Sequence, residues 1–143
     1  SRGEINELQI SVQLQKIWAL ITSNVIRLPK TQNVNSSSLA RLQMMMQYIH
    51  SNYSESISLL EIARAGKVSI STALNLFRNV LDTSPVNYLI CYRLKKAALL
   101  LTNTEKKISA ISTETGFNNT DYFCKTFKRI YSLTPTEYRN IKK

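Results

Sequence analysis

The sequence predicts an all-α fold, and three observations lead to that prediction. The 143 residues contain only three glycines and three prolines, so long stretches carry no helix breaker. Apolar residues recur three and four positions apart, as on one face of a helix, and the alternation typical of strands is weak throughout. With 43% hydrophobic residues, the chain is long enough to bury a globular core, with or without a small appendage.

Residues 1–28 predict one amphipathic helix. Its apolar positions run from Ile5 to Leu28, and it ends before Pro29 because a residue that precedes proline avoids the helical conformation. The apolar face around Trp18 is larger than a linker could cover. We therefore expect residues 5–28 to pack on a missing N-terminal domain or on a second copy of the chain. Residues 29–37 are polar and predict a flexible linker.

Four helices are predicted over the next part of the chain. The first is capped by Ser37 or Ser38 and runs over residues 39–50. A short helix carrying Leu59, Ile62 and Ala63 follows, and Gly66 and then the cap Ser69 lead into the third. Pro85 opens a long central helix over residues 86–102, since proline in a first turn costs no hydrogen bond.

The same order of signals then returns as an internal repeat. Ile62-Ala63 matches Ile111-Ser112, and Ser84-Pro85 matches Thr134-Pro135. Phe77-Arg78 matches Phe127-Lys128 with one residue of slack. The repeat is roughly fifty residues long, which indicates two copies of one supersecondary unit.

Each repeat has the residues that a helix-turn-helix needs, over residues 58–82 and 107–131. A small residue must stand in the first helix where the second crosses it, and Ala63 and Ser112 stand there. The Ser112 hydroxyl is expected to bond back to the carbonyl four residues earlier. The turns are Gly66-Lys67 and Gly116, with Lys67 near the left-handed region unless Gly66 takes the strain. The expected caps of the second helices are Ser69 and Asn118.

The charge of the chain favours a polyanionic partner. The net charge is +10, and from residue 83 onward eleven basic residues face four acidic ones, which places seven of the ten net charges there. With a sequence pI of about 9.8, binding to nucleic acid becomes an expectation, although a solvated basic surface explains charge alone equally well.

Several functional classes are disfavoured. A single histidine excludes sites that need several imidazoles, and the two cysteines, Cys91 and Cys124, have no CxxC spacing, so we expect no metal, no cofactor and no disulfide framework. There is no phosphate-binding glycine loop and no catalytic constellation, so we expect no enzyme and no catalytic residue. No apolar run suits a bilayer and no signal peptide is visible, so we expect no membrane partner and a cytoplasmic protein, which the expected nucleic-acid partner would associate with the nucleoid.

The second repeat resembles the C-terminal signature of the AraC/XylS family of bacterial regulators. The matching residues are Ile108, Ile111 and Gly116-Phe117, then Tyr122-Phe123-x-Lys125-x-Phe127-Lys128, then Thr134-Pro135-x-x-Tyr138-Arg139. The resemblance covers about residues 39–141. It implies a seven-helix DNA-binding domain over residues 38–143, with two helix-turn-helix subdomains joined by the long central helix. Residues 1–28 resemble, more generically, the helical segment that precedes such domains.

The resemblance also implies which side chains read bases in the major groove. In the first unit these are Ser71, Leu74 and Asn75; in the second they are Thr120, Asp121, Cys124 and Lys125. Lys125 stands where the family usually has arginine, and Asn75 replaces another arginine, so it either reads adenine or contacts DNA weakly. Asp121 either caps its helix, the favoured reading, or accepts a hydrogen bond from a cytosine amino group.

Backbone phosphates are expected to meet the remaining basic side chains. These are Arg78, Lys106, Lys107, Lys128, Arg129 and Arg139. For any one of them, a solvated surface position is an equally good interpretation. Arg93 in the central helix is expected to be structural, binding carbonyls or a carboxylate that tie the two subdomains together.

We expect a sequence-specific regulator of transcription that binds double-stranded DNA, probes successive major grooves with two helices and acts as an activator. Contact with RNA polymerase is implied by the resemblance only. The alternative is an architectural protein that binds DNA through charge without reading bases. The sensing region is expected upstream of Ser1.

Overall fold

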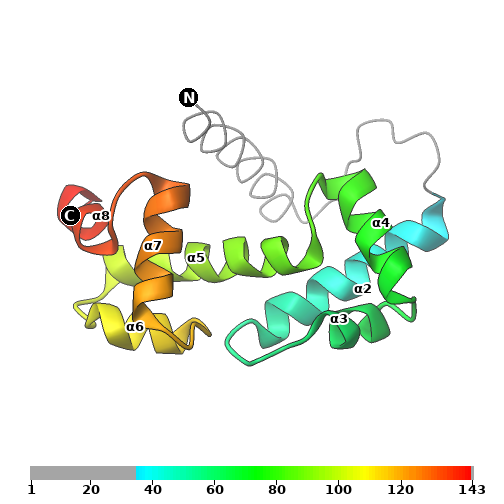
Figure 1. Cartoon of the computed structure of the whole chain (residues 1–143), viewed down its shortest axis with the longest axis horizontal. Helices are drawn as coiled ribbons and strands as arrows, with labels where there is room; N and C mark the ends of the chain where they lie inside the picture. Colours follow the sequence, from blue (N-terminus) through cyan, green and yellow to red (C-terminus); the bar gives the residue numbers. More distant parts are fainter. Residues whose placement is uncertain (1–34, 143) are drawn as a thin grey trace. The chain divides into compact units, whose positions relative to one another are not determined.

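The computed structural model describes residues 35–142, and these residues form helices with no strand among them (Figure 1). The helices are α2 (Ser36–Asn52), α3 (Leu59–Ala65), α4 (Ile70–Leu81), α5 (Pro85–Asn103), α6 (Ile108–Glu114), α7 (Thr120–Tyr131) and α8 (Pro135–Lys142). The all-α, seven-helix prediction is confirmed for this range. The predicted helix over residues 5–28 and most of the predicted linker lie outside the described residues.

The described residues divide into two compact units. The first unit contains residues 35–52 and 57–89, with α2, α3, α4 and the start of α5. The second unit contains residues 53–56 and 90–142, with the rest of α5 and with α6, α7 and α8. Each unit therefore holds one copy of the predicted repeat.

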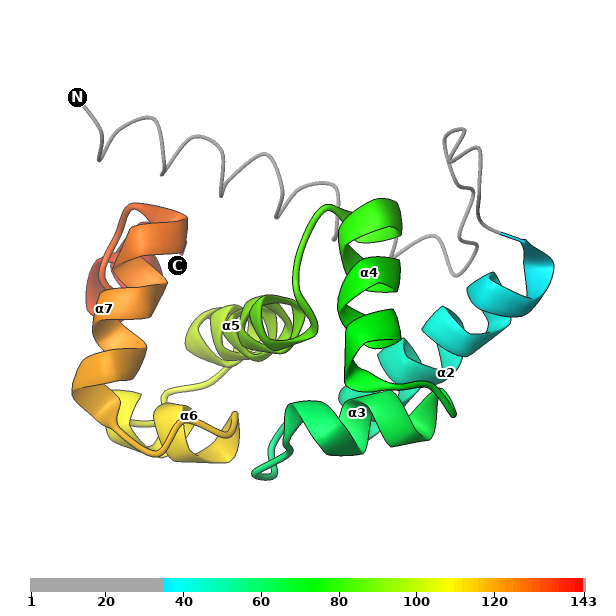
Figure 2. The ribbon, with the colours of Figure 1, turned by 45° about the vertical axis from the view of Figure 1, so that its right-hand side comes forward.

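In the first unit, α2, α3 and α4 pack against one another (Figure 2). Leu42, Met45 and Ile49 lie three and four residues apart on α2 and are fully buried, because they form the apolar face of that helix. The Phe77 ring of α4 meets the buried Tyr88 ring edge-on, with 5.7 Å between centroids. Met45 and Met46 are buried in this core, as helical spacing predicts, whereas Met44 is 38% exposed.

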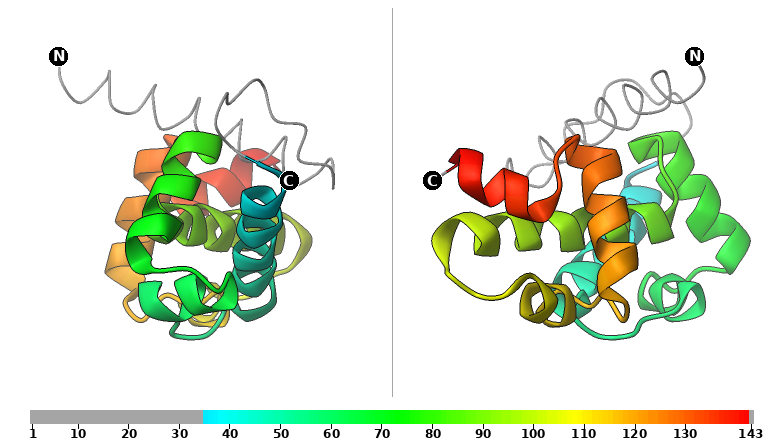
Figure 3. Two further views of the ribbon diagram at one scale, coloured as in Figure 1. Left: turned by 90° about the vertical axis from the view of Figure 1, so that its right-hand side faces the viewer. Right: turned by 60° about the vertical axis from the view of Figure 1, so that its left-hand side comes forward.

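The core of the second unit is a chain of aromatic rings. Phe123 lies 5.0 Å from Phe117 and 5.8 Å from Phe127, measured between ring centroids. Phe127 in turn meets Tyr138 of α8 edge-on at 5.4 Å. These contacts hold α7 against the turn before it and against α8, and the right-hand view of Figure 3 shows α8 (red) beside one end of α7 (orange) and α6 near its other end.

Side-chain caps set where most of these helices begin. The Ser58 hydroxyl accepts from the Glu61 amide and the Glu61 carboxylate accepts from the Ser58 amide, a capping box at α3. Thr134 and Glu137 form the same reciprocal pair before α8. At α5 the Ser84 hydroxyl accepts from the Asn87 amide at 3.1 Å.

The start of α2 differs from the prediction. The cap is Asn35, whose Oδ1 accepts from the Ser38 amide at 2.8 Å, rather than Ser37 or Ser38. The helix therefore begins at Ser36, inside the span predicted as linker, because the polar run contains more than one residue able to cap. The central helix is close to its predicted span of residues 86–102.

Candidate nucleic-acid interface

Helices α4 and α7 are the second helices of the two helix-turn-helix units, and they show the same pattern of burial fifty residues apart. Positions 73, 76 and 77 are buried in α4, and positions 123, 126 and 127 are buried in α7. Positions 75, 78 and 79 are exposed, as are 125, 128 and 129. One face of each helix is therefore fixed in the core, and the opposite face is free to meet a partner.

The outer faces carry side chains suited to nucleic acid. On α4 they are Asn75, Arg78 and Asn79; on α7 they are Lys125, Lys128 and Arg129. Lys125, Lys128, Arg129 and Ser132 line a shallow hollow at the C-terminal half of α7. The α7 face therefore has three cations where the α4 face has one, so the two helices differ in how strongly they attract phosphate.

In the turn before each of these helices, a different residue has the positive φ angle. In the first unit Gly66 has φ −88° and Lys67 has φ 56°; in the second, Gly116 has φ 96°. Val68 donates to the Ala63 carbonyl as Phe117 donates to the Ser112 carbonyl, so the repeat is 49 residues here and Lys67 is the equivalent of Gly116. Lys67, and not Gly66, takes the left-handed conformation. The repeat lengthens from 49 to 50 residues after this point, because the second turn is one residue longer than the first.

The caps of the two helices differ in part from the prediction. Ser69 caps α4 through the Thr72 amide, as predicted. In the second unit Asn119 rather than Asn118 caps α7, accepting from the Tyr122 amide at 3.0 Å. Asp121 is therefore not the cap; it lies in the first turn of α7, where its charge suits the helix dipole.

The side chains predicted to read bases lie on or beside the outer faces. Ser71, Asn75, Asp121 and Lys125 are exposed, and Leu74, Thr120 and Cys124 are half-buried. Burial, and the nearby Asp121 charge, raise the pKa of the Cys124 thiol, so the thiol stays neutral at ordinary pH. It can then lie near phosphate without adding negative charge.

One exposed aromatic residue was missed from the sequence. Tyr122 is 49% exposed and was not among the side chains predicted to contact DNA. Its counterpart fifty residues earlier is the exposed Thr72, which was the available signal. Tyr122 is thus a candidate contact beside Asp121.

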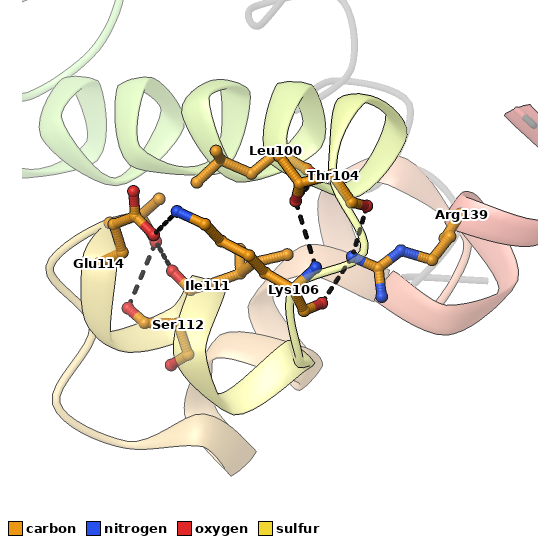
Figure 4. Close-up of polar contacts among 8 residues, drawn as sticks. Leu100, Thr104, Lys106, Ile111, Ser112, Glu114 and Arg139 are labelled. Atoms are coloured by element: carbon orange, nitrogen blue, oxygen red, sulfur yellow. Dashed lines mark hydrogen bonds and ion pairs between the residues drawn. The ribbon is translucent and has the colours of Figure 1, made fainter.

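Arg139, for which a phosphate contact was predicted, makes structural hydrogen bonds within the second unit (Figure 4). Its Nε donates to the Leu101 carbonyl at 3.0 Å, and its Nη2 donates to the carbonyls of Thr104 at 3.3 Å and Lys106 at 2.7 Å. These bonds fasten the segment between α5 and α6 to α8. The sequence could not indicate partners that lie more than thirty residues away along the chain.

The other predicted phosphate contacts are exposed. Arg78, Lys107, Lys128 and Arg129 are all at the surface. Lys106 is also exposed, but its Nζ lies 2.7 Å from the Glu114 carboxylate (Figure 4). It reaches a phosphate only by leaving that exposed ion pair, which is worth little in water.

Arg93 binds backbone carbonyls, as predicted, but both carbonyls belong to its own unit, so these bonds do not join the two subdomains. It donates to the carbonyls of Tyr53 at 2.6 Å and Glu55 at 2.7 Å, and its guanidinium lies 5.9 Å from the Phe117 ring centroid. Burial lowers the pKa of this guanidinium from its usual value, but arginine remains charged at any ordinary pH. Arg93 thus orders the segment after α2.

The Ser112 hydroxyl does not make the predicted bond to the carbonyl four residues earlier. Ser112 is 1% exposed, and its Oγ has no hydrogen-bond partner among the described residues. The neighbouring buried hydroxyl, Thr115 Oγ1, does donate, to the Ile111 carbonyl at 2.7 Å. Two buried hydroxyls three residues apart thus differ: that of Thr115 is satisfied and that of Ser112 is not.

We expect Ser112→Ala to raise the free energy of unfolding by about 1 kcal/mol, because it removes a buried polar group that has no partner. The matched control, Thr115→Val, removes a satisfied hydroxyl and should lower it by about 1 kcal/mol. Urea unfolding followed by circular dichroism measures both. A loss of stability in Ser112→Ala would show that the hydroxyl is bonded in solution.

Two further properties bear on the class of protein. No helix within residues 35–142 is long and apolar enough to cross a membrane. Across the same range, no three side chains of the metal-binding types are grouped closely enough to hold a metal ion. Two helix-turn-helix units, each with a capped second helix and an outer face of polar and basic residues, define a DNA-binding protein of the helix-turn-helix class.

Comparison with known proteins gives the family. A family model described as a helix-turn-helix domain matches residues 62–141. A crystal structure of an AraC-type transcriptional regulator from Chromobacterium violaceum is 30% identical, with a TM-score of 0.70, and the match covers 76% of this chain and 96% of that one. The chain belongs to the AraC-type family of helix-turn-helix transcription regulators.

Longer relatives are similar over nearly the whole chain. An uncharacterised helix-turn-helix transcriptional regulator of Bacillus subtilis, YdeC, is 33% identical over 140 residues, which are 98% of this chain and 48% of the relative. The transcriptional activator RhaR of Mannheimia succiniciproducens is 28% identical over 126 residues, 88% of this chain and 46% of the relative. The chain thus spans about half the length of the curated relatives it matches.

Proposed function

We propose that this chain is the DNA-reading part of a sequence-specific transcription activator, with α4 and α7 each entering a major groove and the two grooves successive along the duplex. Residues 38–143 would form the DNA-binding domain. The observation that carries this proposal is the burial pattern repeated fifty residues apart, which leaves equivalent outer faces free on both helices. The AraC-type family to which the chain belongs supports it.

Within this proposal the two faces divide the contacts. Bases are read by Ser71, Leu74 and Asn75 on α4 and by Thr120, Asp121, Cys124 and Lys125 on α7. Phosphates are met by Arg78, Lys107, Lys128 and Arg129, and by Lys106 when it leaves Glu114. Asp121, already excluded as the cap, accepts from a cytosine amino group, because an exposed carboxylate in the first turn suits a base edge better than a phosphate.

The proposed protein partners follow from the family resemblance. RNA polymerase is the partner expected of an activator. A sensory domain, or a second copy of the chain, would be bound through residues 5–28. The activator names of relatives such as RhaR support this proposal.

The proposal is tested by selecting bound duplexes from a random pool with the 143-residue chain. We expect two conserved segments whose centres lie about 10.5 base pairs apart. Binding of the selected duplex at ~150 mM salt should exceed that of a mixed-sequence duplex by roughly a thousandfold or more. A ratio near one would support the architectural alternative and overturn the proposal.

A further inference from the structure

We propose that Arg41 of α2 is a positioning residue for α4, because its guanidinium holds the helix-turn-helix turn of the first unit in a strained conformation. This inference rests on the proposed function, in which α4 reads bases. Arg41 lies outside the region matched by the helix-turn-helix family model, residues 62–141.

The geometry joins α2 directly to the turn. Arg41 Nη1 donates to the Lys67 carbonyl at 2.8 Å and approaches the Gly66 carbonyl at 3.4 Å. The two segments lie against each other, since a Cβ added at Gly66 would be 3.0 Å from the Arg41 carbonyl oxygen and 2.6 Å from Met45 Cγ. Arg41 as a whole residue is half-buried.

The residue held by this bond is the one in the left-handed region. Lys67 has φ 56°, a conformation that a residue with a Cβ populates roughly tenfold less readily than glycine. A charged hydrogen bond to its carbonyl compensates for that preference. The bond therefore acts where the backbone most needs an external partner.

The second unit meets the same requirement differently. Its equivalent of Lys67 is Gly116, which adopts φ 96° without a Cβ. The arginine beside it, Arg93, donates instead to the carbonyls of Tyr53 and Glu55. One repeat thus uses glycine and the other uses an arginine from the preceding helix.

The position of Lys67 connects this bond to base reading. Lys67 lies two residues before the cap Ser69 and four before the reading position Ser71, so its backbone angles set where α4 starts relative to α3. If Lys67 leaves the left-handed region, the reading face of α4 rotates or shifts. Specific binding then falls more than nonspecific binding, because only base contacts depend on that placement.

The test is a double-mutant cycle of Arg41→Ala and Lys67→Gly. Each variant is titrated with the selected duplex and with a mixed-sequence duplex over a series of salt concentrations, at a temperature where circular dichroism shows it folded. The effect of Arg41→Ala is measured once with Lys67 present and once with Lys67→Gly in place. Within each comparison the residue at position 67 is the same, so any DNA contact made by the Lys67 side chain cancels.

We expect Arg41→Ala to weaken binding of the selected duplex about tenfold when Lys67 is present, and by less than about twofold when Lys67→Gly has removed the strain. The slope of affinity against salt should not change, because Arg41 is not counted as a phosphate contact. Arg41→Lys should recover part of the loss by keeping one charged donor.

Two results would overturn the proposal. An equal loss in both backgrounds, with the salt slope reduced by about one, would make Arg41 a direct phosphate contact. If Arg41→Ala does not weaken binding of the selected duplex in either background, Arg41 has no role in base reading. Failure of the proposed function gives a different result, because the wild-type chain would then not discriminate between the two duplexes. The bond can still be tested in the free protein through the NMR chemical shifts of the backbone amides of residues 69–75. These shifts should change in Arg41→Ala and return toward their wild-type values in the double variant.

Discussion

Replacing Gly116 with alanine is expected to lower the stability of the second unit by about 4 kcal/mol, enough to unfold a marginally stable domain. Gly116 has φ 96°, where a side chain is strained whatever the surrounding space. The added Cβ would also lie 2.6 Å from the Tyr53 carbonyl oxygen and 2.8 Å from Arg93 Nε. Neither neighbour can withdraw cheaply, because Arg93 itself donates to the Tyr53 carbonyl.

Gly66→Ala is the matched control in the other repeat. Gly66 has φ −88°, an ordinary angle for alanine, and the nearest atom to an added Cβ is Met45 Cγ at 2.6 Å. A methionine side chain is flexible, so the core can adjust in part, and we expect a loss of about 1–2 kcal/mol. Because a Cβ at Gly66 would also lie 3.0 Å from the Arg41 carbonyl oxygen, the difference between the two variants reports mainly the cost of the left-handed conformation and of the closer Tyr53 contact.

Amide hydrogen exchange measures both variants unit by unit, because it reports the opening of each segment separately. Gly116→Ala should accelerate exchange in α6 and α7, and Gly66→Ala should act mainly in α2 to α4. Equal effects of the two substitutions would contradict the assignment of Gly116, and not Gly66, as the residue that the turn requires.

The fold could be predicted from the sequence because its signals are local. Helical spacing of apolar residues, the prolines at positions 85 and 135, and the repeat of some fifty residues predicted the helices, and the structure agrees with them to within a few residues. Errors arose where neighbouring residues compete for one role. Asn35 and Asn119 cap helices for which residues one to three positions away were predicted, because spacing arguments do not fix a helix end to the residue.

The candidate site could be predicted only in outline. The outer faces of α4 and α7 follow from the buried face, so the exposure of Asn75 and Lys125 was predictable. The role of Arg139 was not, because its three carbonyl partners belong to a segment far away in the chain. Ser112 lacks a bond that its spacing allows, which only the packed geometry reveals.

The charge on α7 raises the question of what Lys125 contacts. It shares a hollow with Lys128, Arg129 and Ser132, which suits a phosphate, yet it also occupies the position equivalent to Asn75 on α4. Losing a base contact and losing a phosphate contact have different measurable effects. A base contact changes which sequences bind, whereas a phosphate contact changes affinity for all sequences and the dependence on salt.

We expect Lys125→Ala to weaken binding of the selected duplex by roughly 1–3 kcal/mol and to relax the preference at one base position. Lys128→Ala, from the same hollow, and Lys107→Ala, near the start of α6, should weaken selected and mixed-sequence duplexes evenly and reduce the salt slope by about one each. Selection from a random pool with each variant, and titrations over a salt series, separate these outcomes. If Lys125→Ala behaves like Lys128→Ala, the hollow is a phosphate site that includes Lys125, and reading by α7 depends on Asp121, Cys124 and Thr120 instead.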